Sequence, residues 1–107
     1  MIAGVDPEEG ARGPGLAIRG NAPNPFRSST LLRYRLGAPG NVSLEVFDVG
    51  GRRVGGRALG YQQAGDQVAA FERAALGAGV YQYRLSVADP ETGTVRAVDT
   101  GRMLLLK

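Results

Sequence analysis

The sequence contains no cysteine, no histidine and no tryptophan, and it has a single lysine, Lys107. Without cysteine the chain forms no disulfide, and without cysteine and histidine it has none of the usual zinc ligand sets. The lack of histidine also removes the most common general base of enzymes and the histidine of a serine hydrolase triad. These absences predict a protein that is not an enzyme and that needs no metal or cofactor.

Long apolar runs are missing as well. No apolar stretch approaches the roughly 20 residues that a helix needs to cross a membrane. The first residues, MIAGVD, lack the basic and then apolar order of a signal peptide. If the protein is secreted, we therefore expect this chain to be part of a longer one.

Basic side chains outnumber acidic ones, 13 to 10, but they are scattered along the chain. The longest basic run is the pair Arg52-Arg53, whereas nucleic-acid-binding domains cluster their basic residues on one surface. We therefore expect no nucleic-acid partner. An apolar content of 43% in 107 residues supports a small core, at the size of one domain.

Glycine and proline are abundant, with 17 and 6 residues, and they divide the chain into short segments. Three segments, 30–36, 42–49 and 80–87, alternate apolar and polar residues, which is typical of strands with one buried face. We expect the first two segments to form an antiparallel hairpin. The predicted buried faces consist of Leu32, Tyr34 and Leu36; Val42, Leu44 and Val46; and Tyr81, Tyr83, Leu85 and Val87.

Weaker segments complete the strand pattern. Gly55-Gly56 indicates an edge strand with a bulge, and Gly101 indicates a second bulge. About seven short strands, with a turn every roughly 8–12 residues, predict an all-β, immunoglobulin-like sandwich of antiparallel strands. The sequence thus divides into a linker of residues 1–15 and one folded domain of residues 16–107. The weaker segments are 16–18, 53–59, 67–71 and 94–106.

Two binding sites are compatible with this fold class and stay open from the residues alone. A calcium site is one, because Asp89, Glu91 and Asp99 flank one predicted hairpin and carboxylates are preferred calcium ligands. A glycan site is the other, with Phe47 and Tyr61 as the outward-facing aromatic side chains. The glycan site lacks tryptophan, the aromatic residue that such sites most often use.

The sequence ends in an apolar stretch, GRMLLLK at residues 101–107, although chain ends normally fray. In a strand Met103 and Leu105 share one face, and Leu104 and Leu106 share the other, so both faces are apolar. The stretch is either a structural strand, covered on both sides or with one modestly exposed edge, or a strand whose apolar face or open edge docks a partner.

Four stretches together resemble a known family. PNPF at residues 23–26, followed by Ser29-Thr30, resembles its opening motif, and VSLEVFDVGGR at residues 42–52 resembles its central strand and turn. GVYQYRL at residues 79–85 resembles its GVYxYRL strand, and RMLLLK at residues 102–107 resembles its terminal strand. On these motifs the chain resembles the C-terminal sorting domains of type IX secretion cargo, which are related to the immunoglobulin-like domain of the flagellar hook-capping protein.

The resemblance implies a non-catalytic domain that directs a secreted enzyme or adhesin through the outer membrane to the cell surface. Its implied partners are the type IX machinery, including the outer-membrane translocon and the sorting peptidase, and the upstream cargo domains of the parent chain. The implied sorting signal consists of Arg102, Met103, Leu104, Leu105, Leu106 and Lys107. The other matched residues, which we expect to be mainly structural, are Pro23, Asn24, Pro25, Phe26, Asp48, Gly51, Arg52, Gly79, Tyr81 and Tyr83.

The chain departs from the family in two places. Arg102 stands where the family often has lysine, which keeps the charge but changes the donor geometry. The predicted last hairpin is also longer than in the shortest members. The alternative function is an immunoglobulin-like structural or binding module without a sorting role, either a relative of the hook cap or a glycan-binding accessory domain.

Overall fold

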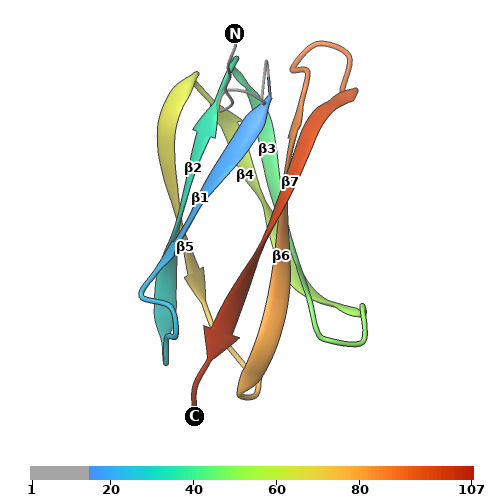
Figure 1. Ribbon diagram of the computed structural model, residues 1–107. Helices are drawn as coiled ribbons and strands as arrows, with labels where there is room; N and C mark the ends of the chain where they lie inside the picture. Colours follow the sequence, from blue (N-terminus) through green and yellow to red (C-terminus); the bar gives the residue numbers. More distant parts are fainter. Residues whose placement is uncertain (1–14) are drawn as a thin grey trace, which may run out of the picture.

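The computed structural model describes residues 15–107, and the expected linker lies outside the described residues except for Gly15 (Figure 1). Within this range the chain forms seven strands and no helix. Neighbouring strands are antiparallel throughout. The strands are β1 Leu16–Ala22, β2 Ser29–Leu36, β3 Gly40–Phe47, β4 Arg53–Gln62, β5 Gly65–Glu72, β6 Gly79–Ala88 and β7 Val95–Leu105.

The strands build two sheets that pack face to face. One sheet has the order β1-β2-β5, and the other has the order β4-β3-β6-β7. Figure 1 shows the two layers side by side, with β1 and β7 next to each other along one side of the sandwich. The predicted all-β, immunoglobulin-like sandwich of about seven strands is confirmed. The described residues contain no helix that is long and apolar enough to cross a membrane.

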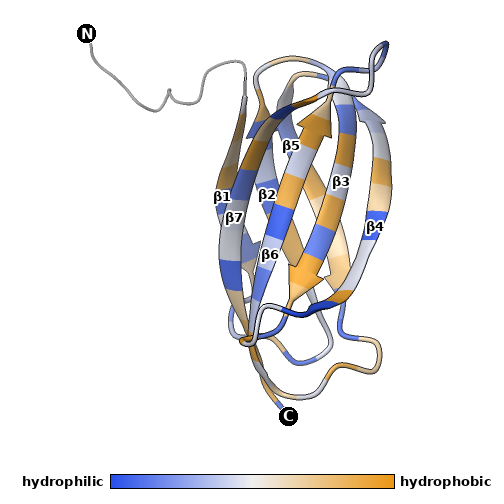
Figure 2. Cartoon of the chain, turned by 90° about the vertical axis from the view of Figure 1, so that its right-hand side faces the viewer, coloured by the Kyte–Doolittle hydropathy of each residue, from blue (hydrophilic) through white to orange (hydrophobic). Residues whose placement is uncertain are grey.

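The core lies between the two sheets. Every residue of the three predicted buried faces, on β2, β3 and β6, is buried. Figure 2 shows the alternation as hydrophobic and hydrophilic bands along β3 and β6. The period of two places one set of side chains in the core and the other in solvent, so a local sequence pattern is enough to choose the buried face.

The predicted hairpin of segments 30–36 and 42–49 is wrong. β2 pairs with β1 and β5, whereas β3 pairs with β4 and β6. The chain crosses from one sheet to the other at residues 37–39, so the buried faces of β2 and β3 meet across the core. Both arrangements bury the same alternating residues, and the alternation therefore does not distinguish a hairpin from a crossover.

The predicted bulge at Gly101 is also wrong. β6 and β7 stay in regular register from the pair Gly79–Leu105 to the pair Val87–Ala97, and the irregularity lies between Val87 and Ala88. Gly101 lies opposite Tyr83. A Cβ atom at Gly101 would lie 2.6 Å from the Tyr83 ring and hydroxyl. Glycine is therefore required here for close packing, because Tyr83 fills the space that any side chain would occupy.

The predicted edge strand with irregular pairing is confirmed in β4, which pairs only with β3 and shifts register twice along it. β4 and β5 are longer than expected. β4 continues to Gln62, and β5 spans Gly65–Glu72 where the pattern predicted residues 67–71. Glycine lowers strand propensity, and β4 contains three glycines, so its sequence pattern predicted a strand that ended too early.

Candidate functional site

The C-terminal stretch forms the end of β7, the edge strand of the four-stranded sheet. Met103 and Leu105 point into the core, and each is 1% exposed. Leu104 points outward and is 37% exposed, Leu106 is half-buried, and Arg102 and Lys107 are exposed. A strand covered on both sides is therefore wrong for this stretch, since one face packs in the core and the other reaches solvent.

The backbone edge of this stretch is closed by the loop that follows β1. The Phe26 amide donates to the Leu104 carbonyl (2.9 Å), and the Leu106 amide donates to the Phe26 carbonyl (2.8 Å). The Asn24 side chain accepts from the Leu104 amide (2.9 Å) and donates to the Arg102 carbonyl (3.4 Å). The hypothesis of an open docking edge is thus wrong for residues 102–106, because the loop already uses these backbone groups.

The same loop is anchored in the core. Phe26 is buried and meets the ring of Phe71 edge to face, with centroids 6.4 Å apart. The buried Thr30 hydroxyl donates to the Pro23 carbonyl (2.8 Å) and accepts from the Asn21 side chain (3.1 Å). The peptide bonds before Pro23 and Pro25 are both cis. The PNPF motif and the threonine after it therefore form one structural unit that covers the end of β7.

Two arginines that the sequence analysis missed hold the last residues. The half-buried Arg73 donates through Nη1 to the carbonyls of Arg27 (2.9 Å) and Leu106 (3.0 Å), and through Nη2 to that of Leu76 (3.0 Å). The Arg27 guanidinium donates to the Lys107 carbonyl (2.6 Å). The contacts of these arginines with Leu106 and Lys107 span 33 and 80 residues of sequence, and no local pattern marks either arginine.

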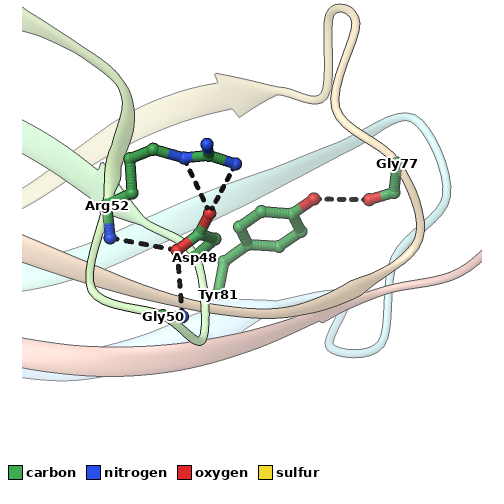
Figure 3. Close-up of polar contacts among 5 residues, drawn as sticks. All are labelled: Asp48, Gly50, Arg52, Gly77 and Tyr81. Carbon is green, nitrogen blue, oxygen red and sulfur yellow. Dashed lines mark hydrogen bonds and ion pairs between the residues drawn. The ribbon is translucent and has the colours of Figure 1, made fainter.

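The turn after β3 is built around Asp48 (Figure 3). Its Oδ1 atom accepts from the amides of Gly50 and Arg52, each at 3.0 Å, and its Oδ2 atom lies 3.3 Å from the Arg52 guanidinium. Gly51 has a φ of +86°, a conformation that favours glycine. The matched residues of this motif therefore form a turn, as expected, and leave no carboxylate oxygen free of a donor.

The matched residues at the start of β6 are structural as well. Tyr81 is buried and its hydroxyl donates to the Gly77 carbonyl (2.7 Å), which fixes the chain entering the strand (Figure 3). Gly79 has a φ of +156°, outside the range that other residues readily adopt. Tyr83 lies in the core opposite Gly101. The side chains of Tyr81 and Tyr83 are therefore not available to contact a partner directly, and Gly79 has no side chain.

Removing the Asn24 side chain is expected to loosen the edge of β7 without unfolding the domain. An Asn24→Ala variant loses the bonds to Leu104 and Arg102, and a typical net contribution of such bonds is about 0.5–1.5 kcal/mol each. We expect faster amide hydrogen exchange at Leu104 and a slightly lower melting temperature. Asn41→Ala is the matched control, because the Asn41 side chain makes no hydrogen bond within residues 15–107. Unchanged exchange at Leu104 would contradict the role of Asn24.

Three carboxyl groups are held in the charged form by donors. The Arg84 guanidinium lowers the pKa of Glu45, the Arg52 amide lowers the pKa of Asp48, and the Glu91 amide lowers the pKa of Asp89. Burial instead raises the pKa of the Tyr34 and Tyr83 hydroxyls. The lowered pKa values of these carboxyl groups make the stability of the domain depend on pH. In acid the unfolded chain binds protons more readily than the folded one, so acid favours unfolding.

We expect the domain to lose stability as the pH falls below about 4.5, where carboxyl groups of the unfolded chain begin to bind protons. The stabilisation is fully present above that pH and disappears as the folded groups titrate. Melting temperatures between about pH 7 and pH 2 test this. A Glu45→Gln variant should flatten part of the decline, since Glu45 pairs with both Arg84 and Arg53. A constant melting temperature down to about pH 2 would contradict the expectation.

The calcium hypothesis is wrong for the described residues. Asp89 accepts the amides of Glu91 (2.8 Å) and Thr92 (3.1 Å), and Asp99 accepts the Ile18 amide (2.9 Å). Residues 15–107 contain no group of three or more acidic side chains that could hold a metal ion. The candidate glycan contacts are Phe47 and Tyr61. Phe47 lies at the C-terminal end of β3, whereas Tyr61 on β4 pairs with Asn41 at the N-terminal end of β3, so the two rings do not form one platform.

The comparisons with known proteins do not identify the chain. No protein-family model matches it, and a search of curated proteins finds no match. The four stretches that resemble the sorting domains therefore remain the basis for relating the chain to that family.

Proposed function

We propose that this domain is a C-terminal sorting module that directs a fused enzyme or adhesin through the type IX secretion system to the cell surface. The observation that carries the proposal is that the four family-like stretches contact one another in the fold. The PNPF loop, the turn after β3, the start of β6 and the C-terminal end of β7 lie at the lower end in Figure 1, whereas the central strand itself runs along the length of the sheet. PNPF binds the terminal strand directly, GVYQYRL pairs with it, and the central strand pairs with GVYQYRL on its other side.

The contacts divide the matched residues between two roles. Asn24 and Phe26 close the edge of β7, and Pro23 and Pro25 belong to the same loop. The other matched residues shape turns and core: Asp48, Gly51, Arg52, Gly79, Tyr81 and Tyr83. Met103 and Leu105 fix the strand, which leaves Arg102, Leu104 and Lys107 with solvent-exposed side chains. On this proposal the outer-membrane translocon reads the exposed residues of a folded end.

The remaining steps of the proposal concern the parent chain. The sorting peptidase would cut in residues 1–15 near Leu16, in the segment that its glycine and proline content predicts to be a linker. The cargo would then be attached to the surface or released. On this proposal the domain is the part that is recognised and takes no catalytic part in these steps.

The test is the export of a fluorescent cargo fused to residues 1–107, in a host with type IX secretion. Fluorescence is measured in periplasmic, surface and medium fractions. The matched controls are the cargo without the domain, and the full fusion in the same host lacking its translocon. We expect surface or medium fluorescence only for the full fusion in the intact host. Retention of that fusion in the periplasm would overturn the proposal and favour an immunoglobulin-like module without a sorting role.

A further inference from the structure

The outward surface above the C-terminal strand has an apolar centre. Val80 on β6 and Leu104 on β7 are direct neighbours in the sheet register. Both point to solvent, with exposed fractions of 43% and 37%. Gln82 and Arg102 form the next pair in the same register and are also exposed. We call the outward side chains of Val80, Gln82, Arg102 and Leu104 the terminal face.

A partner that binds here meets side chains and not free backbone. The amide and carbonyl of Leu104 and the carbonyl of Arg102 are bound to Asn24 and Phe26. Adding a strand to this part of β7 would require those bonds to break. The terminal face includes Val80 and Gln82, which lie 22 and 20 residues before Arg102 in the sequence.

The charges around the terminal face that form no ion pair within residues 15–107 are of one sign. Arg102 and Lys107 form no ion pair with any side chain of residues 15–107. The acidic groups closest in register, on β3 and its turn, are already engaged: Glu45 pairs with Arg84 and Arg53, and Asp48 pairs with Arg52. A docked surface that carries carboxylates would therefore find the Arg102 guanidinium available within the terminal face.

We infer that the terminal face docks into a protein partner that offers a small apolar recess edged by carboxylates, an inference that rests on the proposed function. Val80 and Leu104 fill the recess together, and Arg102 pairs at its edge. A protein is favoured over a lipid surface because stable binding to anionic membranes takes clusters of roughly four to eight basic residues or a large apolar area. The sorting signal is then a surface shared by two strands, not a linear stretch.

Aspartate substitutions on the exported fusion test the inference. Val80→Asp and Leu104→Asp place a charge in the apolar centre, and we expect each to lower export at least about tenfold, as for central residues of an interface. The matched controls are Val98→Asp, which is 50% exposed on the same side of β7, and Val68→Asp, which is 53% exposed on β5 of the other sheet. Both controls should export normally. Arg102→Glu should reduce export, and Arg102→Lys should retain it.

The outcomes separate this inference from the proposed function. Melting curves first establish that all variants fold, which the exposure of the substituted side chains favours. If the unsubstituted fusion is not exported, the proposed function and the inference fall together. If the unsubstituted fusion, Val80→Asp and Leu104→Asp are all exported equally, the inference is overturned while the proposed function stands.

Two further measurements address other occupants of the terminal face. Cosedimentation of the domain with phosphatidylglycerol vesicles, abolished by Val80→Asp and Leu104→Asp, would show a lipid-binding surface and overturn the inference. A dimer in gel filtration that the same substitutions dissociate would show self-association and also overturn it. We expect a monomer that does not sediment with the vesicles.

Discussion

Replacing Leu105 with alanine is expected to lower the free energy of unfolding by about 2–5 kcal/mol, the range for large-to-small changes in a packed core. Leu105 is 1% exposed and lies in the core cluster between the sheets. Its backbone also forms a bridge with Phe26, so a cavity here disturbs the loop that closes β7. Urea denaturation of the unsubstituted domain and of the Leu105→Ala variant measures the difference in the free energy of unfolding.

Leu104→Ala is the matched control, one residue away and with the same change of side chain. Because Leu104 is 37% exposed, we expect it to cost less than about 1 kcal/mol. Equal costs for the two variants would contradict the placement of β7, since a frayed end would treat both leucines alike. The two variants also matter for the export experiments. Deleting residues 102–107 removes the core side chains Met103 and Leu105, so the deletion cannot separate a folding defect from a loss of recognition.

Gly101→Ala is expected to destabilise the domain by about 1–3 kcal/mol or more, the usual cost of overpacking a core. A Cβ atom there would lie 2.6 Å from the Tyr83 ring and hydroxyl, far inside van der Waals contact. Tyr83 is fully buried between neighbouring strands, so its ring has no free space to move into. The strand would have to shift away from the ring, and we expect a lower midpoint of urea denaturation.

Gly55→Ala is the control for this prediction. Gly55 is also a strand glycine, but a Cβ atom there meets no other atom within 4 Å. We expect Gly55→Ala to be neutral or slightly stabilising, since alanine restricts the unfolded chain more than glycine does. A double-mutant cycle with Tyr83→Leu isolates the clash, because Gly101→Ala should cost less once the ring is gone. An equal cost in both backgrounds would show that Tyr83 is not the cause.

The two predictions depend on different kinds of information. The burial of Leu105 was one of the alternatives that its sequence pattern allowed, whereas the tight contact between Gly101 and Tyr83 was not visible there. The sequence analysis interpreted Gly101 as a bulge, a common reason for glycine in a strand. The true reason, a tyrosine on the neighbouring strand, depends on the register between β6 and β7.

The sequence by itself determined the strands and their buried faces. Alternation of apolar and polar residues is a local property, because successive side chains of a strand point to opposite sides. It was therefore sufficient to identify the buried faces of β2, β3 and β6. The pair Gly55-Gly56 indicated the irregular edge strand β4, and the number of short strands indicated the class of fold. Turn chemistry is equally local, and the turn built by Asp48 and Gly51 follows from their positions in the sequence.

The tertiary structure alone decided which strands pair and what surrounds the terminal stretch. β2 and β3 bury the same residues whether they form a hairpin or face each other across the core, so their alternation could not separate the two. The contact of Asn24 and Phe26 with Leu104, and of Arg73 with Leu106, joins segments 33 to 80 residues apart. Backbone groups of an edge strand can bond to any loop that reaches them, and only the folded chain determines which one does.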